Sequence, residues 1–582
     1  MNQISFQPTP QQKAVIFDDG SAFINACPGA GKTRVMAERA RHLYRDMPKG
    51  RGVAFLSFTQ AAVFELDTRL RKGGILTSPV FPSFIGTFDS FVWQFLVAPF
   101  GVKGSDARPR LIADINDIPV RPFHGAHPLP LSCFDPITHE ILPDAARARG
   151  LDVTKKSAHQ VQAYITSVRR RKASLRERGI LEFDQARREA LERVNELTLS
   201  SRIAAALVGR FREVVVDEAQ DCNPDDLEIV SWLRKTGIPV KVVCDPHQSI
   251  YEFRGGVTDH LFAFSDTFEL HERKVLDGNF RSSPNICKAV AQFRPLSVRG
   301  TPDEPLGSLS NEPEPVYVLS YATRAVPSSI GAKFSELLRQ SEIDVWNSPV
   351  VAATKASGLA AVGQPKPSGK REGAVRLAEA VTGFHFSSGF NDVKVALESV
   401  HEILLNLDGC LAHTSYRQYL SDNEIEATSW RPRVITLLRD LRFDPVKYTD
   451  AKEWHTAAKK IVERCLIAPD KKSVSQKLRW NEAIVNALYE APKNAAMPRT
   501  IHSVKGMEFP AVCVVTTAST LKKILDFLET GNPEESAENA RKLYVAASRA
   551  QRLLVFAAPK SQAQRLSNHL RGQGAEVVME EI

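Results

Sequence analysis

Cysteine is scarce in this sequence, and its eight cysteines are scattered over 582 residues. No two of them are separated by only two residues, the spacing typical of zinc knuckles and iron–sulfur sites. Their scatter also argues against a disulfide framework. Cys27 lies just before a predicted helix, whose N-terminus could lower the thiol pKa. A small residue that fits a tight loop is the simpler interpretation of Cys27.

Long apolar runs are also absent. No segment approaches the ~20 apolar residues that a membrane-spanning helix needs. The N-terminal residues MNQISFQPTP lack the basic region and apolar stretch of a signal peptide, so we expect the chain to stay in the cytoplasm. Apolar content of 43% and charged content of 25% are ordinary for a globular protein. The length predicts roughly three to four domains.

Positive charge is in mild excess, with a net charge of +9. Such an excess suits a polyanionic partner but is weak support by itself. The densest basic cluster is SVRRRKASLRER, residues 167–178. It fits either a solvated helix face or a patch that contacts a nucleic-acid backbone, and the sequence leaves both interpretations open.

Apolar runs of strand length alternate with helical patterns and predict an α/β fold. The first group is SAFINA, GVAFLSFT, REVVVD and VKVVCD, and a second group is SPVVAATK, AVCVVTTA and QRLLVFAA. Buried parallel strands that alternate with helices indicate two α/β cores. Helical patterns dominate two further stretches, and VGQPKPSGKREG has the composition of a linker. The predicted parts are a first core (1–94 and 196–275), a helical insertion (95–195), a second core (276–365 and 498–582) and a divergent helical insertion (366–497).

The segment AFINACPGAGKTRV, residues 22–35, has the form of a phosphate-binding loop. A predicted strand leads into A-x-x-G-x-G-K-T and then into a helix, with Ala26 where the full pattern has glycine. Glycines let backbone N–H groups face phosphate oxygens, and the helix adds its positive end. We expect Lys32 to reach the β- and γ-phosphates and the Thr33 hydroxyl to ligate Mg²⁺.

A phosphate loop of this kind needs an acidic partner on a neighbouring strand, and REVVVDEAQD supplies one. Asp217 and Glu218 stand at the end of the valine-rich strand. We expect Asp217 to hold Mg²⁺ through water, and Glu218 to position and deprotonate the attacking water.

The segment Asp217–Asp221 resembles the second motif, D-E-x-Q-D, of the superfamily 1A helicases. This is the UvrD/Rep/PcrA family, with RecB and AddA as relatives. Segments similar to its other motifs occur along the chain in family order. They are PTPQQKAV, before the phosphate loop, and CDPHQSIYEFRGG, GNFRSSPNI, TIHSVKGMEFPAV and KLYVAASRAQRLLVF, after Asp221. The resemblance implies two RecA-like P-loop NTPase cores, each with a helical insertion. It also implies that ATP and Mg²⁺ bind between the cores, and that the chain moves 3′→5′ on single-stranded DNA.

The resemblance implies roles for residues around the nucleotide. Gln11 recognises adenine, and Phe280, which replaces the family's tyrosine, stacks on it. Gln248 senses the γ-phosphate, which Arg281 and Arg549 contact. Such an arginine raises the rate of phosphoryl transfer on the order of a thousandfold or more. Glu508 contacts the ribose, and Gly506 permits close backbone approach. The nucleotide-binding set is Gln11, Ala26, Cys27, Pro28, Gly29, Ala30, Gly31, Lys32, Thr33, Arg34, Phe280, Gly506 and Glu508. The catalytic set is Lys32, Asp217, Glu218, Gln248, Arg281 and Arg549.

Other matched segments imply contacts with a single strand. Aromatic faces hold bases of any sequence, at about 1–3 kcal/mol per stacked base. Phe253 stands where the family has tryptophan, so we expect weaker stacking there. The nucleic-acid set is Phe58, Thr59, Thr87, Ser90, Phe183, Tyr251, Phe253, Arg254 and His502.

The resemblance fails over residues 282–499, so motor activity is a firmer expectation than processive strand separation. The sequence ends soon after the last motif, without the nuclease domain of RecB and AddA, so we expect any nuclease to be a separate protein. Two functions are open. One is a helicase or translocase on single strands and tailed duplexes, in DNA repair or defence. The other is a DNA-sensing ATPase that gates a partner nuclease, since compact UvrD-like chains resemble helicase subunits of two-gene phage-defence systems such as Gabija.

Overall fold

The protein is seen in a computed structural model that divides into two compact units. It describes residues 7–76, 80–112, 115–250, 258–364, 373–386, 390–411, 416–423, 425–467, 471–489 and 497–582. Unit 1 comprises Met1–Phe100, Ala186–Lys366 and Asn494–Ile582, and unit 2 comprises Gly101–Gln185 and Pro367–Lys493. Each unit is described by itself.

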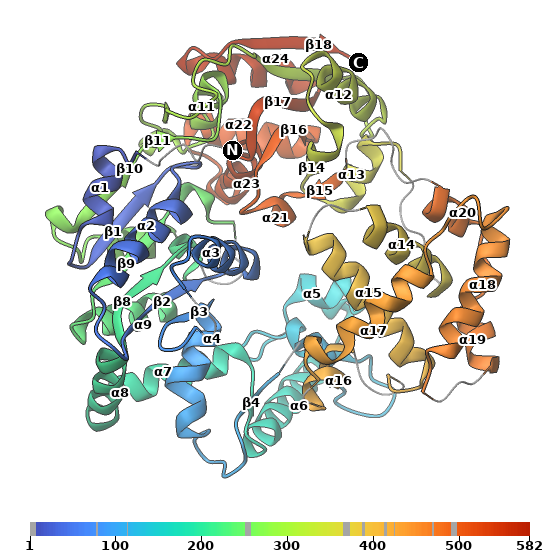
Figure 1. Cartoon of the computed structure of the whole chain (residues 1–582), viewed down its shortest axis with the longest axis horizontal. Coiled ribbons are helices and arrows are strands. Elements are labelled where there is room, and N and C mark those ends of the chain that lie inside the picture. The colour runs from blue at the N-terminus through green and yellow to red at the C-terminus, as the bar shows by residue number, and fades with distance from the viewer. Residues whose placement is uncertain are drawn as a thin grey trace. The chain divides into compact units, whose positions relative to one another are not determined.

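The first half of unit 1 is built on a six-stranded parallel sheet in the order β10-β1-β9-β8-β2-β3 (Figure 1). The central strands β8 and β9 are almost wholly buried and rich in valine, as expected where helices cover a parallel sheet. The strands are β1 (Ala22–Ala26), β2 (Gly52–Ser57), β3 (Phe84–Thr87), β8 (Phe211–Val216), β9 (Val240–Cys244) and β10 (Arg273–Leu276). The helices are α1 (Pro10–Ile16), α2 (Lys32–Arg45), α3 (Gln60–Lys72), α4 (Phe88–Phe91), α7 (Phe183–Asn195), α8 (Leu197–Arg210), α9 (Pro224–Lys235) and α10 (Thr258–Ser265).

The second half of unit 1 has another six-stranded parallel sheet, in the order β15-β14-β16-β17-β13-β18. Its strands are β13 (Val316–Tyr321), β14 (Val350–Ala352), β15 (Pro498–Thr500), β16 (Phe509–Val515), β17 (Ala550–Pro559) and β18 (Val577–Glu581). Its helices are α11 (Pro284–Ala291), α12 (Ser329–Gln340), α13 (Lys355–Ala361), α21 (Ile501–Val504), α22 (Ala518–Thr530), α23 (Ala537–Ala547) and α24 (Lys560–Leu570). The predicted α/β class with two parallel-sheet cores is confirmed.

A short parallel pair of strands continues from the end of the first sheet. It is formed by β11 (Gly278–Asn279) and β12 (Glu304–Pro305). Since β11 follows β10 after a single residue, the segment 276–281 runs from the first sheet toward the second core.

The described residues of unit 2 form hydrophobic clusters within residues 112–180 and within residues 374–488. The first part contains α5 (Pro143–Ala148), α6 (Ala158–Glu177), the parallel pair β4 (Arg110–Leu111) and β7 (Ile180–Leu181), and the antiparallel pair β5 (Pro119–Val120) and β6 (Leu129–Pro130). The second part contains α14 (Gly373–Phe386), α15 (Phe390–Leu407), α16 (Tyr416–Asp422), α17 (Ala427–Asp440), α18 (Ala451–Arg464), α19 (Lys471–Lys477) and α20 (Ala483–Tyr489).

The structure differs from the expected domains in two respects. Residues 95–100 and 186–195, expected in the first insertion, belong to unit 1. The insertion itself is not purely helical, because it contains two short strand pairs, β4 with β7 and β5 with β6. The four-part division of the chain stays a prediction.

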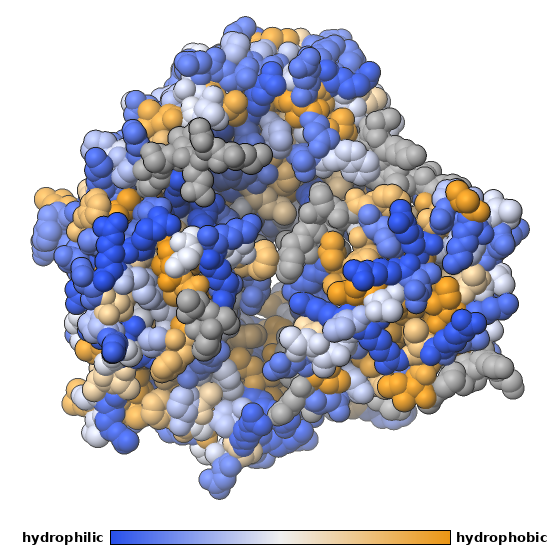
Figure 2. All heavy atoms as spheres, in the orientation of Figure 1, coloured by the Kyte–Doolittle hydropathy of each residue, from blue (hydrophilic) through white to orange (hydrophobic). Residues whose placement is uncertain are grey.

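The surface of the described part is mixed in character. Hydrophilic and hydrophobic residues are interspersed on the face shown in Figure 2. Among the residues placed in the structure, no helix is both long and apolar enough to cross a membrane.

Candidate functional site

The phosphate loop joins β1 to α2 through two residues with left-handed backbone. Gly29 and Gly31 both have φ of 74°, a conformation that side chains other than glycine's disfavour. The Ala30 N–H donates to the Cys27 carbonyl at 3.2 Å and closes the turn. Gly31 is the N-cap of α2 and provides no side-chain cap. The first N–H groups of a 14-residue helix are therefore directed at the loop, where an anion can accept from them.

Helix α1 is fastened to this loop. Thr9 and Gln12 form a reciprocal capping box that starts the helix. The buried Gln12 side chain also donates through Nε2 to the Ala30 carbonyl, at 3.2 Å. The neighbouring Gln11, predicted to recognise adenine, is exposed, and its Nε2 lies 3.2 Å from Asp277 Oδ1.

The segment after β10 packs directly on the loop. The Cys27 N–H donates to the Leu276 carbonyl, and the Phe280 N–H donates to the Gly29 carbonyl, both at 2.9 Å. A Cβ placed on Gly29 would stand 2.6 Å from Arg281 Cβ, so only glycine fits there. The predicted phosphate loop, Phe280 and Arg281 thus lie in one place.

The acidic pair lies at the end of β8. Burial and the neighbouring Glu218 carboxylate raise the pKa of Asp217 to about 7, although Lys32 opposes the shift. Burial would raise the pKa of Glu218 as well, but Lys32, Lys505 and Arg549 together lower it. Glu218 is therefore the carboxylate kept ionised at neutral pH. It also has a left-handed backbone, with φ of 56°, which is uncommon for a side chain of this size.

Residues of the second core reach this acidic pair. Arg549 is 2% exposed and donates to Gln248 Oε1 at 2.8 Å. Burial and the nearby Arg281 lower the pKa of Arg549 to about 9, which leaves it charged at neutral pH. Two residues predicted to act on the γ-phosphate, one from each core, are therefore in direct contact.

Further contacts join the cores, mostly through residues that sequence reasoning did not single out. Lys505 donates to both Asp221 oxygens, at 2.7 and 2.6 Å, and to the Gln248 carbonyl at 3.1 Å. The Tyr544 hydroxyl lies 3.3 Å from Asp245 Oδ2, and Arg541 donates to the Ser249 carbonyl at 2.8 Å. All of these residues except Arg541, which directly precedes the last matched segment, stand inside the matched motifs, and that position was the available signal.

Arg281 pairs with Glu508, at 2.7 Å, and donates to the Ser548 carbonyl at 2.9 Å. Burial would raise the pKa of Glu508, but the Arg281 guanidinium outweighs this effect, and the pKa lies below its usual value. In this structure Glu508, expected at the ribose, faces an arginine. Arg281 Nε is a buried donor that no hydrogen-bond acceptor meets in the described part of the chain. A buried cation with an unused donor suits a phosphate oxygen.

Cys27 in the phosphate loop and Gly506, which lies between α21 and β16, were both predicted to bind the nucleotide. Burial raises the pKa of the Cys27 thiol well above its usual value, which agrees with a packing role rather than a reactive one. Gly506 has φ of 79°, and a Cβ there would meet nothing within 4 Å. Its glycine is explained by the left-handed backbone, and the predicted close approach to a nucleotide stays a prediction. Arg34 is exposed on the first turn of α2.

A divalent metal ion would take its protein oxygens here from Thr33 and Asp217. Among the described residues, no group of three or more histidine, cysteine, aspartate or glutamate side chains has the arrangement of a metal site. The oxygens of Thr33 and Asp217 fit Mg²⁺, which keeps several waters and takes few protein ligands when phosphates complete its shell.

Several of the predicted nucleic-acid residues make contacts within the protein. The Phe58 ring stacks on buried Phe88, with centroids 5.4 Å apart and planes 14° apart, so one of its faces is covered. The hydroxyls of Thr59 and Thr87 cap α3 and α4, and Thr87 also bonds the Ser90 hydroxyl at 2.7 Å.

Five residues of the predicted nucleic-acid set remain. His502 hydrogen-bonds the Ile250 backbone, and burial lowers its pKa. Phe183 is 39% exposed at the start of α7 and is assigned to unit 2. Tyr251, Phe253 and Arg254 lie outside the described residues.

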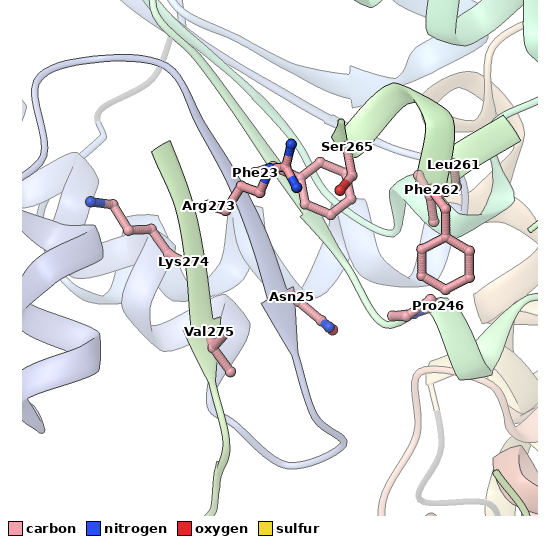
Figure 3. Close-up of a pocket in the computed structure, with 9 residues that line it drawn as sticks. All are labelled: Phe23, Asn25, Pro246, Leu261, Phe262, Ser265, Arg273, Lys274 and Val275. Atoms are coloured by element: carbon pink, nitrogen blue, oxygen red, sulfur yellow. The ribbon is translucent and has the colours of Figure 1, made fainter. Parts of the chain in front are cut away.

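A separate pocket of about 190 Å³ lies on the first sheet (Figure 3). It is lined mainly by apolar side chains of β1, β10 and α10, such as Phe23, Val275 and Leu261. It contains none of the predicted site residues and is smaller than the ~300–1,000 Å³ of ordinary ligand pockets. We assign it no ligand.

Comparison with known families agrees with this geometry. The model of the UvrD/REP helicase N-terminal domain matches residues 8–269, and that of the UvrD-like helicase C-terminal domain matches residues 493–561. The chain belongs to the UvrD-like helicase family. The first match contains all strands of the first sheet except β10, and the second match contains β15, β16 and β17 of the second sheet. The loop, the acidic pair and Arg549 lie within the matched ranges, and Arg281 lies between them.

Curated relatives give the same family. ATP-dependent DNA helicase UvrD1 of Mycobacterium bovis is 28% identical over 302 residues, which is 48% of this chain and 38% of that protein. ATP-dependent DNA helicase Rep of Escherichia coli is 25% identical over 298 residues, 48% of this chain and 42% of Rep. ATP-dependent DNA helicase PcrA of Leuconostoc citreum is 25% identical over 301 residues, 48% of this chain and 38% of PcrA. This UvrD-like chain therefore aligns with about two fifths of the length of these relatives.

Proposed function

We propose that this UvrD-like protein is an ATP-dependent DNA motor that hydrolyses ATP with Mg²⁺ while it moves 3′→5′ along single-stranded DNA. The observation that carries the proposal is the contact of Arg549 with Gln248, beside the acidic pair and the phosphate loop. A site completed by a residue from each core couples the state of the nucleotide to the relative position of the two cores. That coupling is the requirement for stepping.

The chain's own residues supply most of the proposed chemistry. The N-terminus of α2 and Lys32 hold the phosphates. Glu218, kept ionised by the surrounding cations, orients the attacking water and accepts its proton. Arg281 and Arg549 stabilise the charge that spreads over the transferred phosphoryl oxygens. Mg²⁺ at Thr33 and Asp217 would neutralise part of the phosphate charge.

The test measures ATP hydrolysis and strand displacement by the purified protein. It receives no DNA, single strands, or duplexes with a 3′ or a 5′ single-stranded tail, and a Lys32→Ala protein serves as the blank. Hydrolysis stimulated by single strands, with displacement of only the 3′-tailed duplex, is the expected result. Absence of stimulation by every DNA would refute the motor.

Stimulated hydrolysis without displacement would favour the alternative of a DNA sensor that gates a separate nuclease. Nothing in the comparisons points to such a partner. Roles in DNA repair or in anti-phage defence, and the location in the cytoplasm, also stay predictions.

A further inference from the structure

The carboxyl ends of the strands of the first sheet carry two predicted sites side by side. The phosphate loop follows β1 and the acidic pair follows β8, whereas segments predicted to contact single-stranded DNA lie at the ends of β2 and β3. Because β8 pairs directly with β2, the two sites meet between these strands. A side chain that crosses this boundary can carry the state of one site to the other.

Arg187 is such a side chain. This arginine of α7 donates through Nε to Asp226 Oδ1 at 2.8 Å, and through Nη2 to Asp89 Oδ1. Asp89 lies in the first turn of α4, between Thr87 and Ser90 of the predicted DNA-contacting set. One guanidinium therefore joins the DNA side of this sheet edge to helix α9.

Asp226 connects Arg187 to the acidic segment. Its second carboxylate oxygen, Oδ2, accepts from the Asn223 N–H at 3.1 Å, within the capping box that starts α9. A single 3₁₀ turn separates Glu218 from Asn223, and the Asp221 N–H closes it by donating to the Glu218 carbonyl at 3.0 Å. A shift of Arg187 can therefore reach Glu218 through one short hydrogen-bonded segment.

Two carboxylates share this one cation. The Arg187 and Asp226 side chains are 10% and 2% exposed, whereas that of Asp89 is 28% exposed. Burial raises the pKa of Asp226 to about 6 although Arg187 opposes the rise. A phosphate that arrives beside the more exposed Asp89 adds negative charge on that side, and this charge attracts the guanidinium away from Asp226.

We propose that Arg187 is a positioning residue that couples the binding of single-stranded DNA at residues 87–90 to the placement of Glu218 in the ATP site. This inference rests on the proposed function. Coupling between two sites is reciprocal, so bound ATP changes the affinity for DNA by the same factor as bound DNA changes the affinity for ATP.

Arg193 provides a matched control on the same helix. Its side chain is 9% exposed, and it donates to Glu189 Oε2 at 2.9 Å and to the Leu96 carbonyl at 2.8 Å. These partners belong neither to α9 nor to residues 87–90. An effect that comes only from the loss of a buried arginine of α7 should therefore appear in Arg193→Met as well as in Arg187→Met.

The experiment measures the affinity of the full chain for a fluorescent single strand, with and without a non-hydrolysable ATP analogue and Mg²⁺. Arg187→Met removes the bridge. Asp89→Ala removes only the contact at its more exposed end and keeps the buried pair of Arg187 with Asp226. We expect the factor by which the analogue changes DNA affinity to fall from about 5–150 to less than about twofold in both variants. Arg193→Met should keep the wild-type factor, and the double variant of Arg187→Met and Asp89→Ala should lose no more than either single variant.

Two results would overturn the inference while leaving the proposed function intact. One is an Arg187→Met or Asp89→Ala protein that keeps the wild-type factor. The other is an equal loss in Arg193→Met, which would assign the effect to the packing of α7. A wild-type protein whose ATP hydrolysis no DNA stimulates would overturn the proposed function and this inference together.

Discussion

Substitution of Lys505 by methionine should weaken the joint between the two cores. The Lys505 and Asp221 side chains are 3% and 2% exposed, and their shorter contact is 2.6 Å. Methionine keeps most of the side-chain volume but leaves the Asp221 carboxylate buried without its cation. Removing one partner of a buried ion pair costs about 3–5 kcal/mol. This equals a change of more than a hundredfold in the equilibrium between joined and separated cores.

Urea denaturation, with hydrogen exchange to locate the loss, measures this effect. Protection should fall in residues 219–222 and 501–509, which flank the pair. Lys522→Met is the control, since Lys522 pairs with Asp526 on the exposed surface of α22 with side chains 62% and 29% exposed. An exposed pair of this kind contributes about 0–1 kcal/mol.

A double variant, Lys505→Met with Asp221→Leu, separates the charge effect from packing. Replacing a whole buried pair by apolar groups is often neutral, so most of the lost stability should return. The reasoning is refuted if Lys505→Met shifts the free energy of unfolding no more than Lys522→Met does, or if the double variant is no more stable than the single one.

Further expectations concern the two units separately. Lys32→Ala should abolish nucleotide-dependent hydrolysis while leaving the thermal unfolding temperature unchanged within a few degrees. Phe280→Ala should raise the KM for ATP about tenfold or more through lost stacking, with a smaller effect on kcat, in steady-state assays. Phe58→Ala should reduce single-strand affinity in a fluorescence titration, and unchanged affinity would mean that its ring only packs on Phe88. Burial and Arg433 lower the pKa of His401 to about 4, below its unfolded value near 6.5. Stability is therefore lost as pH falls from about 6.5 to 4, by about 3 kcal/mol in all, and acid denaturation of His401→Gln should lack this component.

The sequence by itself determined the parts of the site that are local. Strand, glycine turn and helix follow one another within residues 22–45, so the loop geometry depends on φ angles that only Gly29 and Gly31 adopt easily. The acidic pair likewise follows its strand directly. Alternation of buried strands with helices was enough to predict two parallel-sheet cores.

Sequence patterns were a weaker guide to individual side chains. The hydroxyls of Thr59 and Thr87 lie in segments that resemble nucleic-acid motifs, yet in the structure they cap helices. Capping uses the same hydroxyl that a phosphate contact would use, and a motif does not distinguish the two. Similarly, Glu508 meets Arg281, and a partner 227 residues away leaves no trace in the local pattern.

Only the tertiary structure decided which residues act together. Arg549 reaches Gln248 across 301 residues, and Lys505 reaches Asp221 across 284. Such pairs exist because the two sheets of unit 1 pack in a defined arrangement, which depends on the whole packed surface rather than on any one motif. The same packing brings Lys505 and Arg549 near Glu218. Together with Lys32 these cations keep Glu218 ionised although burial opposes ionisation, beside a carboxyl whose pKa is raised.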